Sequence, residues 1–135
     1  MSQELKVTDL SQLLKVKEGE VVQLPSFNGD VPFRARVKQP SLVKLIAGGA
    51  FPNELLTLAH SVFEGDEKPI QKEMKTAKGL DKVYRTMEIL AENALIEPSY
   101  QELKEAGIQL TDLQLSALMA YCQRGVKMLE YFRTE

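Results

Sequence analysis

The chain has little of what secreted and membrane proteins depend on. It carries one cysteine, Cys122, in 135 residues, so no disulfide forms within the chain, which agrees with a reducing cytoplasm. No apolar run approaches the roughly 20 residues of a membrane helix, and the first residues lack the basic and apolar regions of a signal peptide. With 19 acidic and 17 basic residues, the net charge of -2 argues against a polyanion binder. We expect a cytoplasmic protein without a membrane or nucleic-acid partner.

Groups that carry catalysis are also scarce. His60 is the only histidine and has no second nitrogen or thiol ligand at helical spacing, so we expect a partly buried structural residue. Cys122 falls on an apolar stripe, which favours a packed core thiol over a nucleophile. Gly48 and Gly49 lack the lysine of a phosphate-binding loop and are typical of a helix end. The sequence therefore predicts no catalytic residue, no cofactor and no metal site, and we expect no enzyme activity.

What is present suits one globular domain. Hydrophobic residues make up 44% of the chain and charged residues 27%, and 135 residues can bury a core without disulfides. No internal repeat or low-complexity tract divides the sequence. We predict a single domain over residues 1–135 of mainly helical α+β class, with five to six helices and a small N-terminal β-hairpin.

The hairpin is predicted at residues 20–38. Glu20–Leu24 is one strand, and in the stretch from Val31 to Val37 apolar residues alternate with Arg34 and Arg36, which is typical of a strand with one dry and one basic face. The loop between them is rich in turn-forming residues. A two-stranded ribbon is marginal alone, so helices or another chain must cover it.

A short helix is expected before the hairpin. Thr8 is a candidate N-cap, followed at helical spacing by Leu10, Leu13 and Leu14. Residues 15–20 are charged and predict a loop.

A pair of helices is predicted over residues 40–64. Pro40 suits the first turn of the first helix, which carries Leu42, Leu45 and Ile46 and ends at the two glycines. Pro52 opens the second helix, whose apolar positions recur at helical spacing: Leu55, Leu56, Ala59, Val62 and Phe63.

Residues 65–79 are rich in charged residues and have few apolar ones, and we predict a mobile arm there. Residues 80–135 are predicted to be helical. The first of these helices has the stripe Leu80, Val83, Tyr84, Met87, Leu90, Ala91 and Ala94. Ser99 with Glu102 and Thr111 with Gln114 then form capping boxes for a short and a long helix. The long helix has the stripe Leu115, Leu118, Met119, Cys122, Val126 and Leu129.

The order of helix ends, prolines and glycines in this pattern resembles that of a known family. A basic-alternating strand is followed by Gln39-Pro40-Ser41-Leu42, a short apolar helix ending at Gly48-Gly49, and Phe51-Pro52-Asn53-Glu54-Leu55-Leu56, with a second match at Leu95-Ile96-Glu97-Pro98. In this order the chain is similar to the small tail assembly chaperones of long-tailed bacteriophages over roughly residues 20 to 115. The shared motifs are structural, and the segment 66–79 and the length of the last helix depart from the family pattern.

The resemblance implies a function in virion assembly. Such chaperones bind the long, helical tape measure protein and keep it soluble in the host cytoplasm while the tail tube protein polymerises around it. They are encoded by a phage or a prophage. We therefore expect the tape measure protein and the tail tube protein as partners, and self-association stays open.

An apolar groove between the two helices of residues 40–64 would suit an amphipathic helical partner. The predicted partner-binding residues flank and line this groove: Arg34, Arg36, Leu42, Leu45, Ile46, Leu55 and Leu58. The alternative for each leucine is that it only builds the core.

Two other functions are compatible with the pattern. The short helix from Ser99, the turn at Gly107 and the helix from Thr111 have the lengths of a helix-turn-helix, so a DNA-binding adaptor is one alternative. Recognition helices usually begin with polar and basic residues, whereas this helix begins with Asp112 and Leu113. A structural head-tail connector is the other alternative.

Overall fold

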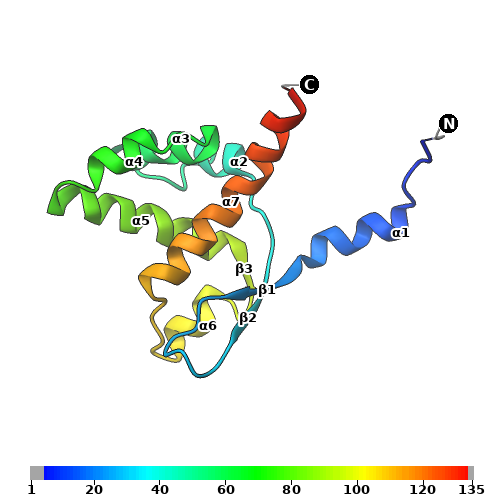
Figure 1. The fold of residues 1–135 in the computed structure, drawn as a ribbon, viewed down its shortest axis with the longest axis horizontal. Helices are drawn as coiled ribbons and strands as arrows, with labels where there is room; N and C mark the ends of the chain where they lie inside the picture. The colour runs from blue at the N-terminus through cyan, green and yellow to red at the C-terminus, as the bar shows by residue number, and fades with distance from the viewer. Residues whose placement is uncertain (1–4, 134–135) are drawn as a thin grey trace.

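Over the residues that the structure describes, seven α-helices, two short 3-10 helices and one three-stranded antiparallel sheet build the fold (Figure 1). The computed structural model describes the backbone of residues 5–133 and the side chains of residues 5–123. The predicted mainly helical α+β class is confirmed, with one helix more than expected. The elements in chain order are α1 (Leu10–Leu13), η1 (Leu14–Glu18), β1 (Glu20–Leu24), β2 (Phe33–Val37), α2 (Leu42–Ala47), η2 (Asn53–Leu55), α3 (Leu56–Glu64), α4 (Lys68–Glu73), α5 (Ala77–Ala94), β3 (Leu95–Glu97), α6 (Tyr100–Glu105) and α7 (Asp112–Arg133).

The predicted hairpin is present as β1 and β2, which pair antiparallel with Glu20 opposite Val37. The second strand begins at Phe33, two residues later than predicted, and Val31 is exposed. Side chains in the loop accept hydrogen bonds from nearby backbone N–H groups, including Ser26 Oγ from the N–H of Gly29 at 2.8 Å. Such local bonds compete with strand pairing and hold the loop open.

A third strand, β3, extends the sheet on the far side of β2 and was not predicted. The register places Glu97 opposite Arg36, and Glu97 Oε1 lies 3.5 Å from the Nε atom of that arginine. The backbone N–H of Lys38 also donates to the carbonyl of Ala94 at 2.9 Å. Three residues are too few to show a strand period, so only the pairing with β2 identifies this segment.

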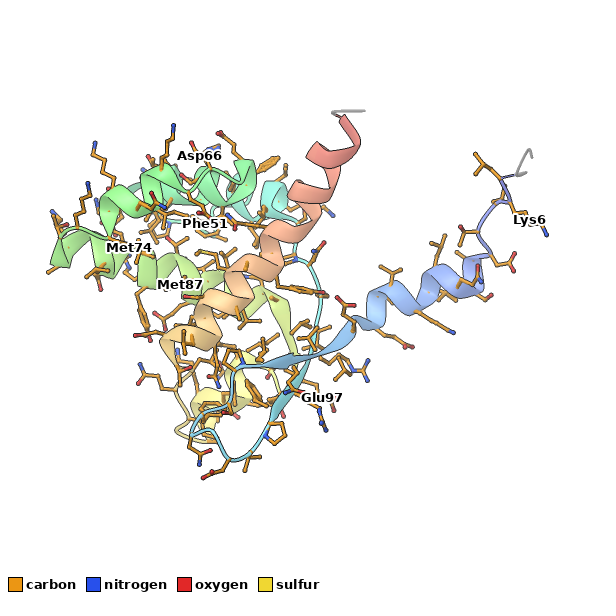
Figure 2. The ribbon with its side chains drawn as sticks, viewed as in Figure 1. Lys6, Phe51, Asp66, Met74, Met87 and Glu97 are labelled. Carbon is orange, nitrogen blue, oxygen red and sulfur yellow. The ribbon has the colours of Figure 1, made fainter. Side chains whose placement is uncertain are left out.

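The core lies where α3, α5 and α7 pack against one another above the sheet (Figure 1). The predicted stripes of α5 and α7 face it, and Leu90, Leu115 and Leu118 are fully buried. Phe51 and Met87 lie inside this layer (Figure 2). Leu80 is an exception on its stripe: it is half exposed, because it lies in the first turn of α5, beside α4 at the end of the layer. The predicted stripe positions Val126 and Leu129 lie outside the described side chains.

The segment 65–79, for which we predict a mobile arm, contains regular helical structure. It contains α4, with Pro69 in the first turn, and Thr76 caps α5 by accepting a hydrogen bond from the backbone N–H of Gly79 at 3.0 Å. One apolar residue is enough to hold the short helix, because Ile70 is buried against the core. Whether the segment moves stays a prediction.

Two predicted helix starts are shifted by one or two residues. Asp9, not Thr8, occupies the N-cap of α1, and residues 14–18 continue as the 3-10 helix η1 rather than as a loop. At α2 the cap is Ser41, whose Oγ accepts from the N–H of Lys44 at 3.3 Å, so Pro40 precedes the helix. The serine hydroxyl can accept this hydrogen bond at the N-cap position, whereas proline has no side-chain oxygen that could accept it. Both predicted capping boxes, at α6 and α7, are confirmed.

Two buried glutamines on α7 provide a test of this packing. The Gln114 side chain donates to the carbonyl of Pro25 at 2.8 Å and accepts from the N–H of Thr111 at 2.9 Å, which ties α7 to the hairpin. Gln123 is equally buried, but its Nε2 has no partner among the described residues.

We expect Gln114→Met to lower the free energy of unfolding by about 1–3 kcal/mol, because it leaves a carbonyl and an N–H unpaired. Gln123→Met should raise it by about 1 kcal/mol, because it removes a buried amide nitrogen that has no partner among the described residues, at similar volume. Urea denaturation of both variants measures the two changes. The same sign in both variants would contradict this assignment of the hydrogen bonds.

Candidate functional site

Most of the predicted partner-binding residues belong to the core. Leu42, Leu55 and Leu58 are buried, with exposed fractions of 7%, 0% and 2%, and Leu45 and Ile46 are half-buried against the same cluster. Helices α2 and α3 pack directly on each other. The space between them is therefore filled, and an open groove there would require the helices to separate.

The two predicted arginines lie on β2, away from its buried face. Arg34 is exposed, and Arg36 is half-buried beside Glu97. Ala35 and Val37, which alternate with them, are buried, so the predicted division into a dry and a basic face is confirmed. The ion pair of Arg36 is open to solvent and stabilises the fold little.

The candidate reactive side chains differ in their surroundings. His60 is exposed on α3, so the prediction of partial burial is wrong: the buried stripe runs through Ala59 and Val62, and residue 60 falls on the outer face. Among the described residues, no three histidine, cysteine or acidic side chains lie close enough together to hold a metal ion.

Cys122 is a packed core thiol, as predicted. Its side chain is buried within the apolar cluster and forms no disulfide. Burial favours the neutral thiol over the charged thiolate and raises the pKa of Cys122 to about 12. The thiol is therefore not a nucleophile at neutral pH.

A cavity of about 260 Å³ lies between α5, α6 and the loop that follows α6, lined by both polar and apolar side chains. The Tyr100 hydroxyl donates to Glu88 Oε2 at 2.6 Å, and Gln109 Nε2 donates to the Tyr84 hydroxyl at 3.0 Å. Burial and the neighbouring Glu88 carboxylate raise the pKa of Tyr100. These bonds join α6 and its loop to α5, so the cluster has a clear structural role.

The most unusual surface is the N-terminal extension, residues 5–18. Figure 1 shows it leaving the body at the start of β1 and pointing away from the other helices, and Lys6 lies near its far end (Figure 2). None of its residues is buried. Six large apolar side chains on it have exposed fractions from 49% to 99%: Leu5, Val7, Leu10, Leu13, Leu14 and Val16.

Gly19 determines where the extension leaves the body. Its φ of 76° lies in the left-handed region, and a Cβ atom there would clash with the carbonyl oxygen of Val37. Only glycine fits both conditions, so the turn between the extension and β1 is tied to the end of β2.

A cleft of about 530 Å³ opens at the base of the extension, and we name it the base cleft. Its walls come from four parts of the chain. They are lined by Lys15, Val16, Gly19, Glu20, Lys38, Gln39 and Tyr121. Gln39 Nε2 donates to the backbone carbonyl of Tyr121 at 3.0 Å, which holds the wall formed by α7 against the wall that follows β2.

The sequence signalled the extension only in part. The spacing of Leu10, Leu13 and Leu14 predicted a short helix, but a stripe of leucines looks the same whether it faces its own core or a partner. The base cleft had no signal at all, because its residues are up to 106 positions apart and only the fold brings them together.

Comparison with protein-family models, with curated proteins and with solved structures gives no match. Over the described residues, none of the helices combines the length and the apolar character that crossing a bilayer requires.

The buried thiol predicts a loss of stability in alkali. In the unfolded chain the thiol loses its proton above its ordinary pKa of about 9, whereas the folded chain keeps it up to about pH 12. The unfolded state therefore binds fewer protons in this window, and the free energy of unfolding falls by roughly 1 kcal/mol per pH unit. Urea denaturation between pH 8 and pH 11 should show this slope, and Cys122→Ala should reduce it. An equal slope in both proteins would contradict a raised thiol pKa.

Proposed function

We propose that this protein is a phage tail assembly chaperone that binds the tape measure protein and keeps it soluble in the host cytoplasm during tail tube assembly. The resemblance of residues 20 to 115 supports the family. The observation that carries the proposal is the extension, because it exposes six large apolar side chains on a segment with no buried residue. A binding role is the direct physical use of such a surface.

The partner's chemistry follows from the shape of the extension. Leu10, Leu13 and Leu14 lie on one side of a helical segment, and an amphipathic helix places such a stripe against an apolar groove or a second helix. The tape measure protein is long, helical and apolar, so it offers repeated surfaces of this kind. The client site is thereby moved from the predicted groove between α2 and α3 to the extension, which needs no rearrangement of the core.

The DNA-binding alternative has no support in the geometry. Helices α6 and α7 have the order of a helix-turn-helix, but Gln114 and Leu115 in the first turns of α7 are buried in the body. The exposed residues at that end are Asp112 and Leu113, one acidic and one apolar. No positive charge in that turn would meet a phosphate backbone.

Co-expression with the tape measure protein of the same genome tests the proposal. We expect a higher soluble yield of the tape measure protein with the native chain than without it. The double variant Leu10→Glu/Leu13→Glu should lose this effect, because it places two charges on the binding stripe without touching a core contact. The measurement is the soluble fraction after cell lysis.

Leu113→Glu is the matched control, since it also charges an exposed leucine, at 71% exposure, but on the body. It should keep the native effect. Capture should change little with added salt, whereas binding to nucleic acid would weaken steeply. An unchanged soluble yield with the native chain would reject the proposal, and a gene for a very long helical protein directly downstream would support it.

A further inference from the structure

The extension is not stable as a free helix. Its helical residues, 10–18, number nine, and isolated helices shorter than about 12–15 residues are marginal in water. Most helical stability in proteins comes from packing of an apolar face, and this face packs on nothing in its own chain. A surface that holds the segment helical must come from another molecule.

We propose that two copies of this chain exchange their extensions, so that the extension of each copy lies in the base cleft of the other. The base cleft is the nearest candidate site for the second extension, because Lys15 and Val16 of the first extension form one of its walls. A second extension entering there packs beside the first. Its volume of about 530 Å³ is similar to that of pockets for drug-sized ligands, about 300–1,000 Å³, so it can hold part of an extension.

Charge favours the same occupant. The base cleft carries two cations, Lys15 and Lys38, against one carboxylate, Glu20. On the extension, Asp9 is the only charged residue between Val7 and Leu14, and it stands next to the leucine stripe. The stretch from Val7 to Leu14 therefore brings apolar side chains and one negative charge to a cleft whose described lining carries two lysines and one carboxylate, while Lys6, Lys15 and Lys17 of the extension flank this stretch.

The exchange also closes on itself. In a two-fold dimer every contact of one extension is repeated by the other. Both extensions and both base clefts are then occupied, so no binding surface is left for a third copy. Unlike a head-to-tail contact, this arrangement stops at two copies. Each copy supplies a wall of the site that the other copy fills.

The buried area distinguishes this dimer from a one-sided contact. The six apolar side chains together expose the equivalent of about four whole side chains, each on the order of 100 Å². One extension in one cleft then buries roughly 800 Å² on both surfaces together, which is no more than a crystal contact. The reciprocal exchange doubles this to about 1,600 Å², the size of a standard stable interface.

The molar mass of the full chain in solution, measured by sedimentation over a range of concentrations, tests the exchange. We expect twice the chain mass of 15.2 kDa. Leu10→Glu/Leu13→Glu should raise the dimer dissociation constant at least about 100-fold, and Leu113→Glu should leave it unchanged. A monomer at all concentrations, a mass that grows beyond the dimer, or a dimer indifferent to the double variant would each overturn the proposal.

A charge reversal tests the cleft itself. Lys38→Glu should weaken the dimer about tenfold or more, because it sets a carboxylate against Asp9 of the second copy. Asp9→Lys in the same chain should restore the dimer, since each interface then again pairs opposite charges. Failure of this rescue would show that the extension binds elsewhere.

Client binding can be distinguished from dimerisation by experiment. Lys38→Glu leaves the extension intact, so under the proposed function the variant with the weakened dimer should still keep the tape measure protein soluble. A dimer without client capture would reject the proposed function and retain the exchange. Client capture by a native chain that stays monomeric would reject the exchange and retain the proposed function.

Discussion

The buried face of α7 is the contact on which the rest of the structure depends. Leu115, Leu118 and Cys122 lie on this face and are buried with α3 and α5 in one cluster. At its start, the helix is joined to the hairpin through Gln114 and the carbonyl of Pro25. Further along, Tyr121 forms a wall of the base cleft. One helix therefore holds the helical layer, the sheet and the candidate binding region in fixed relation.

This arrangement separates stability from binding. The core is complete without the extension, because no residue of α1 or η1 is buried. Substitutions on the extension can therefore change association while the body stays folded, which is the condition for testing a binding surface cleanly. The predicted groove between α2 and α3 would not have this property, since Leu55 and Leu58 serve the core.

The function proposed here rests on surface chemistry rather than on a reactive centre. The exposed His60 and the protonated Cys122 offer no paired acid and base, and the hydrogen bonds of Tyr100 are used to hold α6 in place. An apolar helical surface next to an open cleft is suited to another polypeptide. The same surface can meet a second copy or a client, so the two associations compete for it.

Much of the local structure could be predicted from the sequence. The β1–β2 hairpin, the capping box of Ser99 and Glu102, and the buried stripe of α5 all follow from neighbours within a few residues, where period and capping chemistry are visible. The short strand β3 and the helix α4 were missed, because Ile70 and the pairing of β2 with Glu97 matter only through contacts distant in the chain.

The sequence by itself determined the fold class, the hairpin and the packed state of Cys122, because each depends on local periodicity and on apolar content. Only the tertiary structure decided which leucines are exposed and available to a partner. Leu10 and Leu55 both belong to helical patterns of apolar residues, yet one is exposed and the other is fully buried. An apolar stripe in the sequence indicates a helix face that is buried in some contact. The three-dimensional path of the chain decides whether that contact is with its own core or with another molecule.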